Sequence, residues 1–230
     1  MFIAWVAEWY TRRSQKPMIA RSCGFESHPR HTMRGYFRIP EISRNKRLRA
    51  YIIGLALGDG NLSNPNGRAV RLRITCDKRY AKLLRRIIES LCMLFPQNRV
   101  GTVRRRGCVD VSVYSNQLTT LLGWHWDNGP KDVQNVRVPL WIKRDTRFSR
   151  ECLRGLFQTD GSLYNDRGYS MLNFVNTGAS LTNDVFSMMK DLGYAPCIQK
   201  LQQTNGKVKN TIRLSKNVPQ FVRDIGFWKE

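Results

Sequence analysis

Two acids, Asp59 and Asp160, stand at matching places in two similar apolar stretches, and each is followed directly by a glycine. A carboxylate at the C-terminal end of a helix has the unfavourable sign for the helix macrodipole, so stability alone would favour Lys or Arg there. Gly60 and Gly161 are typical of the left-handed position just after a helix. Two carboxylates that lie side by side repel each other, and a divalent cation relieves that repulsion. The pattern therefore predicts a metal site wherever the fold brings the two acids together.

The elements that must position the acids each contain one glycine in an otherwise apolar helical pattern. These glycines are Gly54, in the stretch 51–62, and Gly155, in the stretch 152–163, and they coincide when the two stretches are aligned. A glycine in a helix body costs roughly 1 kcal/mol relative to alanine, so it usually has a packing reason. Without Cβ atoms, two helix backbones can approach closely. We therefore predict a helix interface at Gly54 and Gly155 that delivers both acids to one end of the helix pair.

The two stretches resemble the LAGLIDADG motif of homing endonucleases, and two copies in one chain are similar to the single-chain, two-motif, monomeric branch of that family. Leu57 and Gln158 occupy the position of the motif's first acid. The family tolerates that difference because the last acid of the motif is the catalytic one, and Asp59 and Asp160 match it. The resemblance covers the chain from about Arg44 to the C-terminus.

The elements expected after the two motifs follow the same order, which indicates an internal duplication. In the first half they are a motif helix (45–57), a strand (68–76), a helix (78–95), a hairpin (99–114) and a short helix (116–122). In the second half they are a motif helix (147–158), a strand (169–177), a helix (180–192), a hairpin (195–214) and a short helix (218–225). The resemblance implies an α+β fold of two αββαββα halves, 33–130 and 131–230. The halves would be related by a pseudo-two-fold axis and form a saddle of two antiparallel sheets, with the motif helices at its centre.

Residues 1–32 carry no clean helical or strand period. The string Gly24-Phe25-Glu26-Ser27 back-translates to a sequence that accommodates GGTTCGAATCC, which looks like the T-arm of a transfer-RNA gene. We interpret this leader as translated tRNA gene, with the true start at Met33. The alternative is a disordered basic arm that contacts the DNA backbone. Sequencing the mature N-terminus distinguishes the two, because a protein that begins at Met1 contradicts the tRNA interpretation.

The composition favours a nucleic-acid partner. The chain has 39 Lys and Arg against 17 Asp and Glu, for a net charge of +22, and so basic a chain most often binds a polyanion. A ribosomal or other basic housekeeping protein has the same composition. The six cysteines include no C-x-x-C pair, which argues against a zinc ribbon and a disulfide framework. No apolar run approaches the ~20 residues of a membrane span. We expect a cytoplasmic, nucleoid-associated or organellar protein that is not secreted and has no membrane partner.

Basic and polar side chains alternate with apolar ones along several expected strands. A strand ribbon fits the major groove of duplex DNA, where outward side chains can read base edges. The predicted DNA-binding residues are Arg71, Arg73, Thr75, Arg104, Arg106, Ser112 and Tyr114 in the first half, and Lys200, Gln202, Lys209, Thr211 and Arg213 in the second. Any one of them could instead be a solvated position or a phosphate contact. Together they predict a long basic surface whose affinity for DNA falls steeply with salt.

The resemblance also implies the chemistry, which is hydrolysis of DNA with Mg²⁺, or Mn²⁺ as a substitute. The implied metal ligands are Asp59 and Asp160, assisted by the backbone carbonyls of Gly58 and Thr159. The family has a basic residue near each metal, and the candidates for that catalytic role are Lys216 and Lys143. Each acid would serve one DNA strand, so the expected product is a double-strand break with short 3′ overhangs.

Three functions are compatible with this pattern. The first is a site-specific endonuclease of a mobile genetic element, either intron-borne or free-standing, that acts as a monomer on double-stranded DNA. The second is an RNA-splicing maturase that binds intron RNA. The third is a DNA-binding regulator on the same fold with an inactive site. Retention of both Asp59 and Asp160 argues against the third function, because a regulator has no need of both acids.

Overall fold

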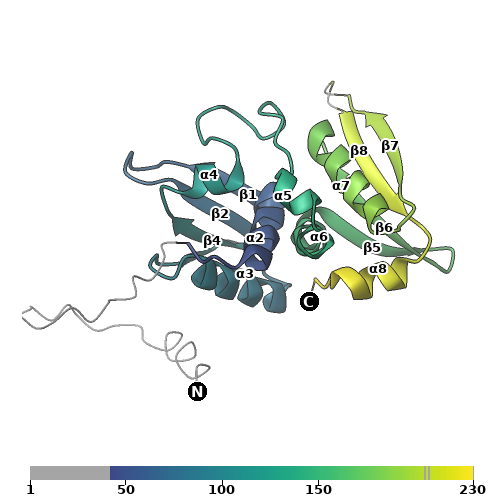
Figure 1. Ribbon diagram of the computed structural model, residues 1–230, viewed down its shortest axis with the longest axis horizontal. Coiled ribbons are helices and arrows are strands. Elements are labelled where there is room, and N and C mark those ends of the chain that lie inside the picture. Colours follow the sequence, from purple (N-terminus) through teal and green to yellow (C-terminus); the bar gives the residue numbers. More distant parts are fainter. Residues whose placement is uncertain (1–41, 205, 207, 230) are drawn as a thin grey trace, which may run out of the picture. The chain divides into compact units, whose positions relative to one another are not determined.

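The computed structural model describes residues 42–204, 206 and 208–229, which lie in a compact unit that spans Ile39–Glu230. The leader expected at 1–32 falls outside the described residues. Two four-stranded antiparallel sheets, each accompanied by helices, make up the described part of the chain (Figure 1). The predicted α+β class with two antiparallel sheets is confirmed.

The two halves repeat the same order of elements. The first half contains α2 (Lys46–Asp59), β1 (Gly60–Ser63), β2 (Arg71–Asp77), α3 (Ala81–Leu94), β3 (Gly101–Arg104), β4 (Cys108–Tyr114) and α4 (Leu118–Leu122). After a short α5 (Leu140–Lys143), the second half contains α6 (Thr146–Asp160), β5 (Gly161–Asp166), β6 (Tyr169–Asn176), α7 (Ala179–Asp191), β7 (Cys197–Gln202), β8 (Val208–Leu214) and α8 (Val218–Ile225). The strand orders β1-β2-β4-β3 and β5-β6-β8-β7 are equivalent, as a duplication requires.

The motif helices α2 and α6 lie against each other (Figure 1). A Cβ atom on Gly54 would collide with the carbonyl oxygen of Cys152. A Cβ atom on Gly155 would collide with the carbonyl oxygen of Tyr51 and lie 2.6 Å from the backbone nitrogen of Leu55. Glycine is therefore required at both positions because the two backbones themselves are in contact, and α2 is buried on all sides through this stretch.

Gly60 and Gly161 do not have the predicted left-handed conformation. Their backbones are extended, with φ −76° and ψ 141° at Gly60 and φ −83° and ψ 152° at Gly161, and they are the first residues of β1 and β5. A Cβ atom on Gly60 would collide with the carbonyl oxygen of Ala56, and one on Gly161 with that of Phe157. The prediction is wrong because the lack of space beside the last helical turn, rather than a positive φ, is what requires glycine.

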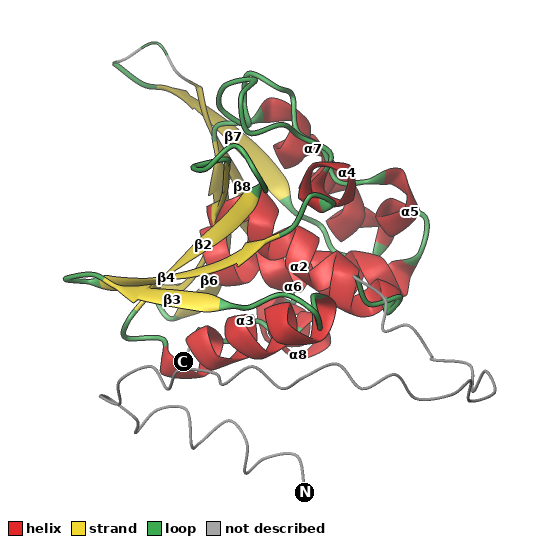
Figure 2. Ribbon diagram, turned by 90° about the vertical axis from the view of Figure 1, so that its left-hand side faces the viewer, coloured by secondary structure: helices red, strands yellow, loops and turns green. Residues whose placement is uncertain are grey.

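Each sheet packs one face on helices and leaves the other face outward. In β2, Leu72 and Ile74 are buried, whereas Arg71, Arg73 and Thr75 between and beside them are half-exposed. Figure 2 shows the strands toward one side of the described unit and the helices toward the other. The alternation along β2 therefore separates a core face from a polar outer face. Among the described helices, none is long and apolar enough to span a membrane.

Candidate active site and nucleic-acid interface

The two acids end the two motif helices at the same end of the helix pair. Asp59 is the last residue of α2, and Asp160 is the last residue of α6. One residue earlier the helices are in contact, because a Cβ atom on Gly58 would overlap the hydroxyl oxygen of Thr159. The structure thus brings Asp59 and Asp160 close enough that the carboxylate of Asp59 raises the pKa of Asp160.

A lysine from outside the two motifs caps the C-terminal end of α2. The Lys131 ammonium donates hydrogen bonds to the carbonyl oxygens of Ala56, Leu57 and Gly58, at 3.1, 2.7 and 2.5 Å. Its nitrogen also lies 5.8 Å from the centre of the Trp124 ring. A cation here has the favourable sign for the helix macrodipole and adds hydrogen bonds to the last carbonyls of the helix, of which that of Ala56 also accepts from the Gly60 N–H.

A second lysine does the same for α6. The Lys229 ammonium donates to the carbonyl oxygens of Thr159 and Gly161, at 2.9 and 2.5 Å, and its nitrogen lies 5.8 Å from the centre of the Phe227 ring. Each motif helix therefore ends in one carboxylate and one lysine. The site as a whole contains two acids and two cations, and each lysine interacts electrostatically with both acids.

Loss of hydration shifts all four groups toward their neutral forms. It raises the pKa of Asp160 to about 6, against the smaller lowering effect of its hydrogen bond with Asn176 and of the lysines. It also raises the pKa of Asp59, which keeps an exposed edge, although the two lysines lower it. Desolvation lowers the pKa of Lys131 to about 8 and lowers that of Lys229. The site is a cluster of poorly hydrated charges in a position open to a ligand.

The two half-sites differ in the partner of the acid. The Asn176 side-chain nitrogen donates to a carboxylate oxygen of Asp160 at 2.9 Å. The pairing registers of β1–β2 and β5–β6 make Cys76 the counterpart of Asn176 in the first half. Cys76 is buried, and desolvation followed by the charge of Asp59 raises its pKa to about 11. Asp160 is thus held by an amide, whereas Asp59 has a neutral thiol as its neighbour.

The donor set suits a hard divalent cation that receives its other ligands from outside the protein. Two carboxylates are available, and Mg²⁺ commonly binds through one or two carboxylates with water and phosphate oxygens completing the octahedron. Within the described residues, no group of three or more His, Cys, Asp or Glu forms a closed metal site. The predicted carbonyl ligands of Gly58 and Thr159 are already hydrogen-bonded by Lys131 and Lys229, so the two carboxylates are the ligands with capacity to spare.

The structure does not bring the predicted lysines to the acids. Lys143 forms an ion pair with Asp184 of α7 at 2.6 Å, and the same carboxylate accepts from the backbone nitrogen of Val138 at 2.9 Å. Lys143 therefore ties the connection between the halves to α7. Lys216 is exposed in the turn before α8. Lys131 and Lys229 occupy the place that was predicted for these two residues.

The outer face of the first sheet contains five of the predicted DNA-binding residues. The register pairs Arg71 with Tyr114, Arg73 with Ser112 and Thr75 with Asp110, so cross-strand partners share this face. The buried carboxylate of Asp110 accepts from the Thr75 hydroxyl and from Arg105, both at 2.7 Å. Asp110 thus fixes the positions of Thr75 and Arg105 on the outer face.

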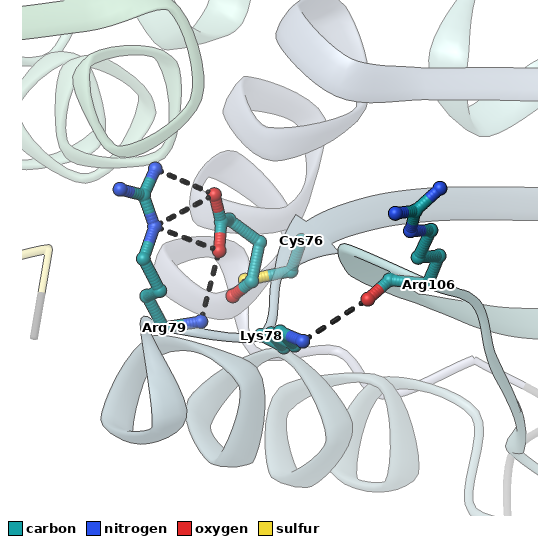
Figure 3. Close-up of polar contacts among 5 residues, drawn as sticks. Cys76, Lys78, Arg79 and Arg106 are labelled. Carbon is teal, nitrogen blue, oxygen red and sulfur yellow. Dashed lines mark hydrogen bonds and ion pairs between the residues drawn. The ribbon is translucent and has the colours of Figure 1, made fainter.

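Two predicted arginines of this sheet lie elsewhere. Arg104 pairs with Val109 and is therefore on the core-side face of the edge strand β3. Arg106 is in the hairpin turn, where its carbonyl accepts from the Lys78 ammonium at 3.0 Å (Figure 3). The Arg79 guanidinium forms an ion pair with the Asp77 carboxylate at 2.8 Å. Arg105, which was not predicted, is the hairpin arginine that contacts the outer face.

The second sheet has an equivalent outer face on β8. Thr211 pairs with Val175 and Arg213 with Asn173, and Lys209 continues the same alternation. Lys200 and Gln202 were predicted on this face, but they pair with Asn210 and Val208 and therefore lie on the other one. The prediction is wrong because the edge strand β7 is exposed along most of both faces, so its sequence has no clean alternation.

An arginine occupies an equivalent central place on each outer face. The Nε atoms of Arg73 and Arg213 are buried and have no hydrogen-bond partner within the described residues. The Arg73 guanidinium also lies 4.0 Å from Asp110, and that of Arg213 donates to Asp166 at 3.2 Å. The two arginine side chains are 33% and 30% exposed, so the outer ends of both guanidinium groups can contact an external acceptor.

Two family models match the two halves separately. A model described as the WhiA LAGLIDADG-like domain matches residues 48–116, and one described as a LAGLIDADG-like domain matches residues 147–226. Together they cover more than half of the chain. The chain therefore belongs to the LAGLIDADG family and carries two such domains.

Individual relatives agree with that assignment. A structure of variants of the homing endonuclease I-DmoI is 20% identical, with a TM-score of 0.55, over 78% of this chain and 95% of that one. I-DmoI in complex with DNA and Mn gives the same TM-score and identity. The N-terminal LAGLIDADG domain of DUF199/WhiA is 14% identical, with a TM-score of 0.54, over 84% of this chain and 88% of that one. These likenesses establish the fold.

A curated relative matches at the sequence level. The tRNA-splicing ligase RtcB of Methanopyrus kandleri is 27% identical over an alignment of 202 residues, and the match covers 77% of this chain. The matched region is 20% of that protein, so the chain spans about a fifth of the length of the curated relative it matches.

The raised pKa of Asp160 predicts a pH-dependent stability in metal-free protein. Between its ordinary value of 3.8 and about 6, the folded chain holds a proton that the unfolded chain has released, so stability falls as the pH rises through this window. After discounting for partial exposure, we expect a loss of about 1 kcal/mol. Asp160→Asn removes this titration. The free energy of unfolding, measured in urea, should therefore rise by about that amount in the variant relative to wild type between pH 4 and pH 7. If the difference in unfolding free energy between the two proteins is the same at both pH values, the assignment is contradicted.

Proposed function

We propose that this protein is a divalent-metal-dependent, site-specific endonuclease that makes a double-strand break in DNA. The observation that carries the proposal is the convergence of Asp59 and Asp160 at the contact between α2 and α6, with one lysine beside each helix end. The fold shared with the homing endonuclease I-DmoI supports the same function. A structural role alone does not account for two carboxylates at helix C-termini, where they oppose the macrodipole.

Asp59 and Asp160 would hold the divalent cation between the protein and the two DNA strands. When bound, the cation supplies charge stabilisation to the reacting phosphate and lowers the pKa of an attacking water. Lys131, with a pKa of about 8, is mostly protonated at neutral pH and can stabilise negative charge on the phosphate. Lys229 has the equivalent role at the other acid. Asn176 fixes the orientation of the Asp160 carboxylate through its hydrogen bond.

The outer faces of the two sheets would bind the duplex. Their arginines and polar side chains have the alternation that suits groove contacts, and the net charge of +22 favours a phosphate-rich partner. Arg73 and Arg213 are the strongest candidates, because they hold equivalent places on the two outer faces and their side chains are 33% and 30% exposed.

Arg73→Ala and Arg213→Ala are each expected to weaken duplex binding about five- to tenfold, and a phosphate contact would also reduce the salt slope by about 1. Fluorescence anisotropy across a salt series measures both quantities. Arg79→Ala is the matched control for the loss of one positive charge, since Arg79 lies in the turn between β2 and α3 and not on an outer face. Equal losses in all three variants would mean that net charge alone governs binding.

A DNA-binding regulator is the second candidate. The match of residues 48–116 to the WhiA LAGLIDADG-like domain favours it. This candidate predicts specific duplex binding that does not require a divalent metal and produces no cut.

A randomised duplex library separates the two candidates. The library is incubated with the protein and Mg²⁺, and both strands of every cleaved molecule are sequenced. The endonuclease predicts paired cuts at a common sequence that disappear in EDTA. Recovery of a bound consensus with both strands intact in Mg²⁺ and in Mn²⁺ favours the regulator and rejects the endonuclease.

A further inference from the structure

A pocket with both apolar and basic side chains lies at the end of α2 that is opposite to Asp59. It has a volume of about 470 Å³ and is formed where the start of α2 meets α4 and α5. The side chains that matter here are Lys46, Arg49, Asn116, Gln117, Thr120 and Trp141. In Figure 2, α4 and α5 lie on the side of the described unit away from the strands. The pocket is therefore separate from the outer faces of the sheets.

The pocket is strongly basic. Its lining includes two cations, Lys46 and Arg49, and no Asp or Glu. Arg44 and Arg47 beside them are exposed. These residues surround the N-terminal end of α2, where the macrodipole already favours an anion and where the first turn contains no acid.

The cations of the pocket have capacity for a ligand. The Lys46 ammonium has no hydrogen-bond or ion-pair partner among the residues that the structure describes. Arg49 uses its Nε atom to donate to the carbonyl oxygen of Ser43 at 2.7 Å, which fixes the guanidinium and leaves its terminal nitrogens for an acceptor. A fixed guanidinium beside a free ammonium suits a phosphate group.

An aromatic ring and amide groups accompany the charge. Trp141 is 36% exposed, and an edge contact with Phe148, at 5.4 Å between ring centres, holds its indole in place. Asn116 and Gln117 are exposed at the same pocket, where amides can form hydrogen bonds with base edges. An aromatic platform next to paired cations is the arrangement that binds one unstacked nucleotide.

We propose that this pocket is a second nucleic-acid site, which binds a single-stranded polynucleotide with a phosphate on Lys46 and Arg49 and a base against Trp141. The volume suits one nucleotide, whereas a duplex, whose bases stay stacked, would offer the pocket only its backbone. The 14 residues of α2 span roughly 20 Å, so the pocket and the acids can be occupied at the same time. The proposal does not depend on the endonuclease function.

The test uses labelled single-stranded RNA and DNA 12-mers of mixed sequence, with a labelled duplex of the same sequence as the third ligand. The full chain is titrated into each and the binding followed by fluorescence anisotropy. Trp141→Ala and Lys46→Glu should each weaken single-strand binding about tenfold and change duplex binding less than twofold. Arg73→Ala, on the outer face of the first sheet, should show the reverse pattern.

Two comparisons keep the test decisive. If Trp141→Ala unfolds, Trp141→Phe should retain most of the single-strand affinity while Lys46→Glu loses it. If the two variants bind both single-stranded RNA and single-stranded DNA more weakly, the pocket recognises the phosphate backbone and the bases. If they bind only RNA more weakly, the pocket also recognises the 2′-hydroxyl. Wild-type affinity for both single strands in folded Trp141→Ala and Lys46→Glu proteins would overturn the proposal.

Discussion

Asp59→Asn and Asp160→Asn are each expected to abolish double-strand cleavage, with the rate of that product falling at least about 10³-fold. Loss of one carboxylate removes a charged ligand of the cation, and a bound cation contributes several kcal/mol to stabilisation of the transition state. Asparagine keeps the size of the side chain, so the contact between α2 and α6 is preserved. Binding of duplex should stay within about threefold of wild type, because the outer faces of the sheets are unchanged.

Cleavage of a selected target, measured on both strands, checks this prediction. Asp127→Asn is a suitable control, since Asp127 is an exposed acid between the halves. It should cut as wild type does. Unchanged double-strand cleavage by both active-site variants would falsify the assigned site.

Gly155→Ala is expected to destabilise the fold by about 3 kcal/mol or more, at the upper end for overpacked cores. The added Cβ atom would meet the backbone of α2 at Tyr51 and Leu55, where no side chain can move aside. The helices must separate, which would also move Asp160 away from Asp59. Urea unfolding measures the loss of stability, and cleavage should fall with it.

Gly107→Ala is the matched control for this effect. A Cβ atom there has no neighbour within 4 Å, and the backbone does not need a positive φ. We expect a change of no more than about 0.5 kcal/mol. If Gly155→Ala were as stable as Gly107→Ala, the close contact between the motif helices would be wrong.

The order of elements was predictable because apolar periodicity is strong in both halves. Stripes such as Leu83, Ile87 and Leu91 identify α3, and the alternation of Leu72 and Ile74 identifies β2. The strands β1 and β5 were harder to find. Asn, Pro and Gly follow β1 closely and resemble a loop, and most side chains of β5 are exposed on both faces. Gly60 and Gly161 were identified as special, but a sequence does not distinguish a positive φ from a lack of space.

The acids were predictable because they repeat at matching positions, and the lysines were not. Lys131 and Lys229 lie outside any helix or strand and at unequal distances from the helix that ends each half, so duplication gives no signal for them. They reach the acids through the return of the chain to the helix ends. The prediction for Lys200 and Gln202 was wrong for a different reason. An edge strand that is exposed on both faces has no apolar alternation that shows on which face each side chain lies.

Binding of Mn²⁺ to the protein–duplex complex, followed by electron paramagnetic resonance, is the most direct measurement of whether Asp59 and Asp160 form one site. The wild-type complex should bind Mn²⁺, and either Asp→Asn substitution should weaken that binding at least about tenfold. Full-strength Mn²⁺ binding in both variants would contradict the account, because the cation would then lie away from the contact between α2 and α6.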